Sequence, residues 1–195
     1  MQVKDNIALV HVQDKGLPPI VETYFEFNHL KQLYRQGWLR RGVPPERCES
    51  VAEHSFGVAI LALFLADAHF AGLDREKLLR MALLHDFGEI YAGDLIPADE
   101  VGVEEKHRRE AESVTGVLGK LANGPAYVAA WQEYERGESA EARFIRQVDR
   151  LEMALQASVY QHQGLVDPSE FLASAERAMS APELAEIVAQ LQALN

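Results

Sequence analysis

Two adjacent residues, His85 and Asp86, end an apolar stretch and carry side chains that can bind a metal ion or move a proton. Taken alone, the pair is more simply a helix-end histidine beside a solvated carboxylate, because the chain has seven histidines and such a neighbour arises by chance. Its surroundings change this interpretation. Glu89 follows about one helical turn later, and Asp94 stands beside Gly93 in an expected turn. This concentration of polar groups favours a functional site.

Two residues elsewhere in the chain could complete such a site. His54 lies one turn from the start of an expected helix, and alone it is more simply a hydrogen-bonded, half-buried histidine. Asp149 lies within another expected helix, where Arg146 or Arg150 could offset the cost of burying its charge. With the adjacent pair, they give two imidazoles and two carboxylates. This ligand set suits Mn²⁺, Fe²⁺, Co²⁺, Ni²⁺ or Zn²⁺ and leaves positions for water and a phosphate oxygen.

The elements that must position these residues are helices, according to the spacing of apolar residues and the placement of glycine and proline. Ser50, followed three residues later by Glu53, predicts a capping box at the start of the helix that carries His54. Only residues 7–12 indicate a strand. The expected helices cover residues 21–36, 51–71, 74–91, 103–121, 126–136, 140–163, 168–179 and 182–194.

This pattern predicts an all-α protein in which residues 1–195 form a single-domain helical bundle. Its core is expected from about residue 22 to 165, and residues 166–195 are expected to add C-terminal helices. The charged run within residues 103–121 is typical of a solvated face, although Lys106 or Arg109 could lie over a neighbouring subunit's site. The apolar spacing in residues 182–194 favours core packing over a dimer seam.

Composition excludes several classes of protein. With 48% hydrophobic and 25% charged residues, the chain has the balance of a soluble globular protein. A net charge of −11 disfavours binding to nucleic acid polymers or anionic membranes but permits a small anionic substrate in a local basic pocket. The longest apolar run, residues 58–66, is well short of the ~20 residues that span a bilayer. Cys48 is the only cysteine, which excludes a disulfide framework. We expect a cytoplasmic protein.

The spaced residues His54, His85-Asp86 and Asp149 resemble the H…HD…D signature of the HD-domain metal-dependent phosphohydrolases. Residues 49–55 (Glu-Ser-Val-Ala-Glu-His-Ser), His85-Asp86 with Glu89, and residues 93–99 (Gly-Asp-Leu-Ile-Pro-Ala-Asp) are more closely similar to the HD-domain 5′-deoxynucleotidases. Two further segments resemble the eukaryotic-type branch of that family, and the resemblance extends from about residue 33 to 160. These segments are residues 104–110 (Glu-Glu-Lys-His-Arg-Arg-Glu) and 151–158 (Leu-Glu-Met-Ala-Leu-Gln-Ala-Ser).

The resemblance implies an all-α HD fold, a homodimer and hydrolysis of deoxynucleoside 5′-monophosphates to deoxynucleoside and phosphate. It also implies one divalent metal ion per subunit, which would be Mn, Co, Mg, Fe, Ni or Zn. Arg35 resembles a phosphate-binding arginine near a tryptophan, here Trp38, which could stack on a base or pack in the bundle. Glu89 and Asp94 would be the acid–base and water-positioning carboxylates. The implied metal ligands are His54, His85, Asp86 and Asp149.

Other functions stay open. Another HD phosphohydrolase, acting on a nucleoside triphosphate, a cyclic nucleotide or a small phosphate ester, would carry the same ligands. A non-catalytic metal- or nucleotide-binding module would not need Glu89 and Asp94, and a purely structural bundle would pair its polar residues internally. A loop over residues 43–48 is longer than in the relatives, which leaves the roles of Arg40 and Arg41 open. Cys48, in this loop, is either a simple loop residue or a reactive thiol.

Overall fold

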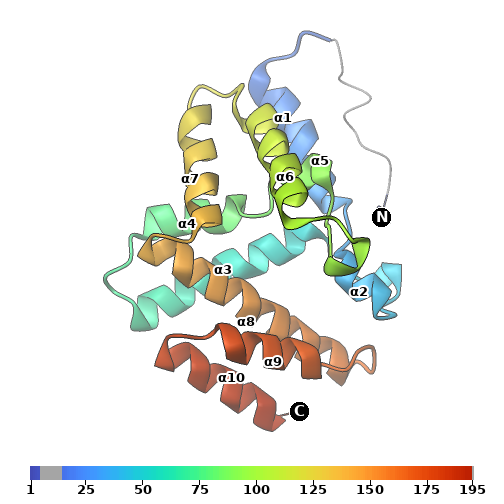
Figure 1. The fold of residues 1–195 in the computed structure, drawn as a ribbon, viewed down its shortest axis with the longest axis vertical. Coiled ribbons are helices and arrows are strands. Elements are labelled where there is room, and N and C mark those ends of the chain that lie inside the picture. The colour runs from blue at the N-terminus through green and yellow to red at the C-terminus, as the bar shows by residue number, and fades with distance from the viewer. Residues whose placement is uncertain (5–14, 195) are drawn as a thin grey trace. The chain divides into compact units, whose positions relative to one another are not determined.

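A computed structural model describes residues 1–4 and 15–194, and the regular structure of these residues is helical (Figure 1). Two isolated β-bridges, Val3–Leu33 and Tyr34–Ser50, are the only β pairing within this part of the chain. The prediction of an all-α fold is confirmed, whereas the strand expected at residues 7–12 lies outside the described residues. The α-helices are α1 (Pro19–Phe27), α2 (Gln36–Arg40), α3 (Val51–His69), α4 (Arg75–Leu84), α5 (Glu89–Ala92), α6 (Val103–Leu118), α7 (Gly124–Arg136), α8 (Ala140–His162), α9 (Ser169–Ala178) and α10 (Pro182–Leu194).

The chain divides into two compact units. The first unit comprises Met1–Ser55 and Leu84–Gln132, and the second comprises Phe56–Leu83 and Glu133–Asn195. Each unit has its own cluster of buried hydrophobic side chains. The boundaries of the single domain predicted over residues 1–195 therefore stay a prediction.

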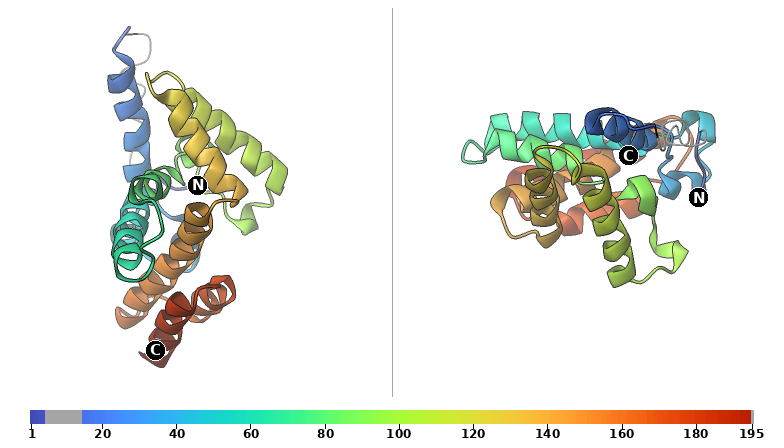
Figure 2. Two further views of the ribbon diagram at one scale, coloured as in Figure 1. Left: turned by 90° about the vertical axis from the view of Figure 1, so that its left-hand side faces the viewer. Right: turned by 90° about the horizontal axis from the view of Figure 1, so that it is seen from above.

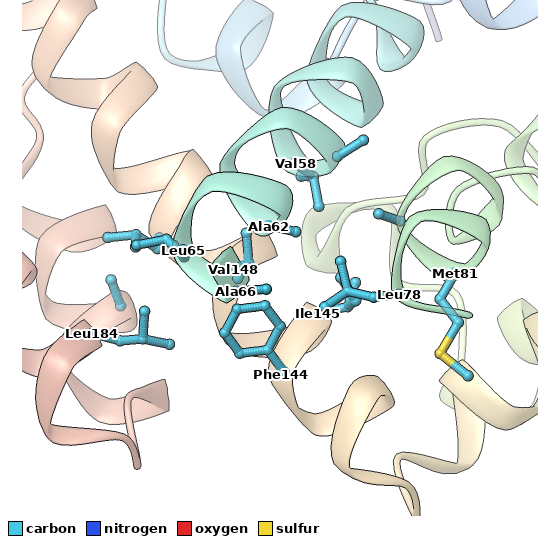
Figure 3. Close-up of a cluster of buried hydrophobic side chains, with 14 of the residues drawn as sticks. Val58, Ala62, Leu65, Ala66, Leu78, Met81, Phe144, Ile145, Val148 and Leu184 are labelled. Atoms are coloured by element: carbon cyan, nitrogen blue, oxygen red, sulfur yellow. The ribbon is translucent and has the colours of Figure 1, made fainter. Parts of the chain in front are cut away.

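The hydrophobic cluster of the second unit is built by α3, α4, α8, α9 and α10, with Tyr134 from the last turn of α7 (Figure 3). Helices α9 and α10 lie beside each other and next to α8 (Figures 1 and 2). In α10, Leu184, Val188 and Leu191 are buried in this cluster, which agrees with core packing of the last helix. The side chains labelled in Figure 3 are those of Val58, Ala62, Leu65, Ala66, Leu78, Met81, Phe144, Ile145, Val148 and Leu184.

Helix α3 is long and apolar enough, by length and composition, to cross a membrane. Core helices of soluble proteins pass the same test, so this property is weak evidence for a membrane span. Val58, Ala62 and Ala66 of α3 are fully buried in the second unit's hydrophobic cluster. Packing in the hydrophobic cluster of that unit therefore accounts for the apolar composition of α3.

The first unit packs α1, α5, α6 and α7 around a second cluster of buried hydrophobic side chains. Ile90 of α5 and Val114 of α6 are both buried there, which places the short helix α5 against α6. Nearly all residues predicted to do chemistry belong to this unit. The cluster consists of Leu30, Leu33, Val51, Ile90, Val114, Val117, Leu118 and Trp131.

The predicted helix over residues 21–36 is wrong in its last third, because Arg35 has an extended backbone (φ −65°, ψ 102°). Helix α1 ends at Phe27 and is followed by a 3₁₀ turn, Asn28–Lys31. The backbone beyond it pairs with another segment. Arg35 N donates to Glu49 O at 3.1 Å, and Val51 N donates to Leu33 O at 2.9 Å. These long-range bonds replace the helical ones and bring Arg35 next to the start of α3.

The predicted capping box at the start of α3 is confirmed. Ser50 N donates to Glu53 Oε2 at 2.6 Å, and Glu53 N donates to Ser50 Oγ at 3.3 Å. Both bonds satisfy amide donors at a helix end that has no earlier carbonyls to pair with. The box fixes the first turn of α3, in which His54 is the fourth residue.

The predicted continuous helix over residues 74–91 is also wrong, since α4 ends at Leu84 and α5 begins at Glu89. In a continuous helix, Glu89 N would donate to His85 O. Instead Glu89 N donates to Asp86 O at 3.0 Å, and the indole N–H of Trp131 donates to His85 O at 3.1 Å. A tryptophan far away in the sequence thus binds the carbonyl of His85 that would have accepted the next helical hydrogen bond. Residues 85–88 form a turn instead.

Gly88 closes this turn, and we expect Gly88→Ala to destabilise the protein. A Cβ at position 88 would lie 2.6 Å from Cβ of Glu110 and 3.0 Å from its Cα, so the backbones of the turn and of α6 would have to separate. Overpacking of this kind costs about 1–3 kcal/mol of unfolding free energy, which urea denaturation measures. Gly116→Ala is the matched control, because a Cβ there meets no atom within 4 Å. Equal stability of the two variants would contradict the expected clash.

Candidate metal and phosphate site

Three predicted metal ligands converge in the first unit. His54 comes from the first turn of α3, while His85 and Asp86 come from the turn between α4 and α5. The Nε2 atom of His54 lies 3.7 Å from Oδ2 of Asp86, and the Nε2 atom of His85 lies 3.3 Å from the same oxygen. Both histidines are buried, and their ring centroids are 5.4 Å apart. One carboxylate oxygen is therefore the meeting point of two imidazoles.

This cluster fits a divalent transition-metal ion. Bonds of about 2.0–2.2 Å place neighbouring ligand atoms about 2.8–3.6 Å apart in octahedral or tetrahedral shells, close to the separations of 3.3 and 3.7 Å from Asp86 Oδ2. Two imidazole nitrogens and a carboxylate oxygen are a borderline donor set that accepts several first-row metals. Asp149 lies on α8 in the second unit, and its role as a fourth ligand stays a prediction.

Arg35 faces three carboxylates in the same unit. Its Nη1 atom lies 3.3 Å from Asp94 Oδ1, 3.5 Å from Asp86 Oδ2 and 3.8 Å from Glu89 Oε1. The arginine side chain is only 13% exposed. Because a guanidinium stays charged and presents several donors, Arg35 both balances this acidic group and offers a cation to an anionic ligand.

Both carboxylate oxygens of Asp94 have partners. Its Oδ1 faces Arg35, and its Oδ2 accepts a hydrogen bond of 2.5 Å from the backbone N–H of Gln36, the first residue of α2. Gly93, with φ of 81°, ends α5 and turns the chain so that Asp94 meets α2. In this arrangement Asp94 orients Arg35. The contribution of Gln36 through its backbone was not visible in the sequence.

Glu89 is the predicted site carboxylate that is best placed to hold a proton. It is 4% exposed, and its Oε2 atom has no hydrogen-bond partner among the described residues. Burial, reinforced by the charges of Asp86 and Asp94, raises the pKa of Glu89 well above its usual range. A carboxyl with a raised pKa beside a charged cluster is suited to acid–base chemistry.

Trp38 and the residues whose roles the sequence left open are packed or paired within the protein. Trp38 is fully buried, and its indole N–H donates to Glu49 Oε1 at 2.7 Å, which agrees with the packing interpretation, while substrate contact stays a prediction. Cys48 is buried, and burial is the main cause that raises the pKa of its thiol to about 12. A thiol with this pKa stays protonated at neutral pH, which argues against a reactive cysteine. Arg40 pairs with Asp99, and Arg41 donates to Gly37 O at 3.2 Å.

Sequence reasoning missed the residues that hold the short helix α5. The hydroxyl of Tyr91 donates to Oε1 of the buried Glu26 at 2.9 Å, and Lys120 Nζ donates to Oε2 of the same carboxylate at 2.7 Å. A shallow hollow of about 400 Å³ beside Tyr91, lined by α5 and α6, contains none of the predicted site residues. No local motif identifies these anchors, because they come from α1, from α5 and from the turn that follows α6.

Comparison with known proteins agrees with this geometry. A family model described as "HD domain" matches residues 27–192. The 5′-deoxynucleotidase HDDC2 of Bos taurus is 39% identical over 171 residues, which cover 84% of this chain and 80% of that protein. The 5′-deoxynucleotidase YGK1 of Saccharomyces cerevisiae is 33% identical over 151 residues, covering 73% of this chain and 68% of that protein.

Two crystal structures share the fold. The PH0347 protein of Pyrococcus horikoshii OT3 superposes with a TM-score of 0.75 at 33% identity, covering 90% of this chain and 99% of that one. A protein from Magnetospirillum magnetotacticum MS-1, described as a predicted metal-dependent phosphohydrolase, gives a TM-score of 0.67 at 30% identity, covering 89% and 91%.

Proposed function

Because this chain belongs to the HD domain family, we propose that it is a metal-dependent 5′-deoxynucleotidase, which hydrolyses deoxynucleoside 5′-monophosphates to deoxynucleoside and phosphate. The observation that carries the proposal is the convergence of His54 and His85 on Asp86, with Arg35 and Glu89 beside them. The relatives named 5′-deoxynucleotidase support the reaction, since the match to the bovine protein covers most of both chains.

The residues that would hold one divalent ion are His54, His85 and Asp86 together with Asp149, which is assigned by sequence resemblance. When bound, such an ion supplies Lewis-acid polarisation of a phosphoryl oxygen and lowers the pKa of a bound water. The donor set is compatible with Mn, Co, Mg, Fe, Ni or Zn. We also propose a homodimer and a cytoplasmic location, as the family resemblance and the composition imply.

The chain's own side chains supply the other parts of the reaction. Arg35 would neutralise charge on the phosphoryl group, and Asp94 with the Gln36 amide keeps the guanidinium oriented for this. Glu89 would deliver a proton to the 5′-oxygen as the phosphorus–oxygen bond breaks, so that the leaving group departs as a hydroxyl. A water-positioning role for Asp94 stays a prediction.

Phosphate release tests this proposal. Metal-stripped protein is resupplied with Mn²⁺ or Co²⁺ and given matched deoxy- and ribonucleoside 5′-monophosphates. We expect metal-dependent release from the deoxy substrates and little from the ribo substrates. Equal release from both sets would contradict deoxy selectivity. Release only from triphosphates, cyclic nucleotides or small phosphate esters would favour the alternative HD phosphohydrolase, and no release from any substrate would favour a binding module.

A further inference from the structure

Helix α6 has two faces with different uses. Its exposed face forms the expected solvated ion pairs, in which Arg108 contacts Glu105 and Glu112, and Arg109 contacts Glu105. The opposite face carries Lys106, Glu110 and Ser113, spaced by four and three residues and therefore aligned along the helix. The charged run is thus only partly a solvated face, and the second face contacts the segment that carries the site.

Three residues join this second face to residues 87–95. Ser113 Oγ accepts from Tyr91 N at 3.2 Å and donates to Phe87 O at 3.5 Å. The side chain of Glu110 packs against Gly88 so closely that a Cβ would not fit. Lys106 Nζ donates to Leu95 O at 3.1 Å. Helix α6 therefore holds both ends of the segment that contains Glu89 and Asp94.

Lys106 is the member of this face with an electrostatic link to the site. Its Nζ lies 3.6 Å from Glu110 Oε1, and the side chain is 39% exposed. Burial acts to lower the pKa of Lys106, but the carboxylates of Glu110, Glu89, Asp86 and Asp94 outweigh burial and raise it. The ammonium group is therefore charged and lies within the field of the acidic cluster.

The contact of Lys106 leads to Arg35 through two neighbouring residues. Leu95, whose carbonyl Lys106 binds, directly follows Asp94. Asp94 in turn accepts from the Arg35 guanidinium and from the Gln36 amide. The loop that contains Asp94 and Leu95 (the Asp94 loop) is therefore held by α6 on one side and by α2 on the other. The Asp94 carboxylate, which orients Arg35, lies between them.

We propose that Lys106 is a positioning residue for phosphate binding: it holds the Asp94 loop, and through Asp94 it keeps Arg35 oriented toward the phosphate group of the substrate. Its positive charge also offsets the repulsion between the acidic cluster and an incoming phosphate dianion. The identity of the substrate rests on the proposed function, whereas the link from Lys106 to Arg35 rests on the contacts above.

The test compares Lys106→Met with Arg109→Met, which removes one positive charge from the exposed face of the same helix. Calorimetry measures binding of inorganic phosphate to the Mn²⁺-loaded full chain, and steady-state kinetics separate KM from kcat. Losing the Lys106–Leu95 hydrogen bond releases the segment that holds Asp94. We therefore expect a phosphate affinity about tenfold weaker (about 1.4 kcal/mol) and a similarly raised KM for Lys106→Met, with kcat nearly unchanged. Lys106→Arg should restore both values, and Arg109→Met should match the wild type.

Several results would overturn the proposal: wild-type phosphate affinity in Lys106→Met, an equal loss in Arg109→Met, or a fall in kcat with KM unchanged. Absence of phosphate binding by the wild-type protein would also overturn it. Circular dichroism verifies folding, and Lys106→Gln replaces the methionine variant should that variant not fold. If the wild type binds phosphate but hydrolyses no deoxynucleotide, the calorimetric comparison still decides the role of Lys106, and only the proposed function fails.

Discussion

Asp86→Ala should lose divalent-metal binding and, with it, almost all turnover. Oδ2 of Asp86 is the atom on which the Nε2 atoms of His54 and His85 converge, at 3.7 and 3.3 Å. Removing a residue that only supports a metal ligand costs about 10–100-fold in affinity, so loss of this carboxylate should cost at least about 100-fold. Metal content after dialysis, and titration calorimetry with Mn²⁺, measure the change.

Asp67→Ala is the matched control for this variant. Asp67 is an exposed carboxylate in the second unit that pairs with Arg75, so its removal changes the net charge equally without touching the site. We expect it to bind metal and turn over substrate as the wild type does. Retention of a full equivalent of Mn²⁺ by Asp86→Ala would contradict the assignment of Asp86 as a ligand, even if turnover were lost.

The positions of the candidate metal ligands in the first unit could be predicted from sequence because the signals that place them are local. The Ser50–Glu53 capping box fixes where α3 begins and therefore where His54 lies, and both hydrogen bonds of the box are present. The apolar residues before His85 mark α4 in the same way. Local spacing of this kind depends only on residues a few positions apart, so a single sequence is sufficient to detect it.

The turn at residues 85–88 could not be predicted, because its cause is distant in the sequence. Apolar spacing continues through this segment, yet Trp131 takes the carbonyl of His85 and Glu110 packs against Gly88. The extended backbone of Arg35 has a similar origin, since its N–H bonds to Glu49 rather than to a preceding turn. Tertiary contacts override helical periodicity at the positions where the site is built.

These interruptions bring the candidate site residues together. In a continuous helix, His85 and Asp86 would diverge by about 100°, whereas in the turn both reach the same point. Arg35 likewise precedes α2 in extended backbone, so its side chain meets Asp94 beyond the end of α5. The candidate site is therefore assembled where helices stop: α6 and α7 supply the contacts that end α4, and the segment before α3 supplies those around Arg35.

Glu89→Gln should retain metal yet lose most of the catalytic rate. Glutamine preserves the shape of the side chain and can still face Arg35, but it cannot carry the proton that the leaving 5′-oxygen requires. General acid–base catalysis typically contributes about 10²–10⁴-fold, so kcat should fall by about that factor while the Mn²⁺ content stays at the wild-type level. Single-turnover phosphate release measures the chemical step, and metal analysis of the same sample tests the site.

The control is Glu112→Gln, which removes an exposed carboxylate of α6 that pairs with Arg108. We expect this variant to show wild-type kinetics. Full activity of Glu89→Gln would contradict the role of Glu89 as the proton donor to the 5′-oxygen. Asp94 would then be the candidate proton donor. That outcome would require Asp94 to release contacts it makes in this structure, because Arg35 occupies one of its oxygens and the Gln36 amide the other. Glu89, buried beside Arg35 with one oxygen lacking a hydrogen-bond partner among the described residues, faces no such requirement.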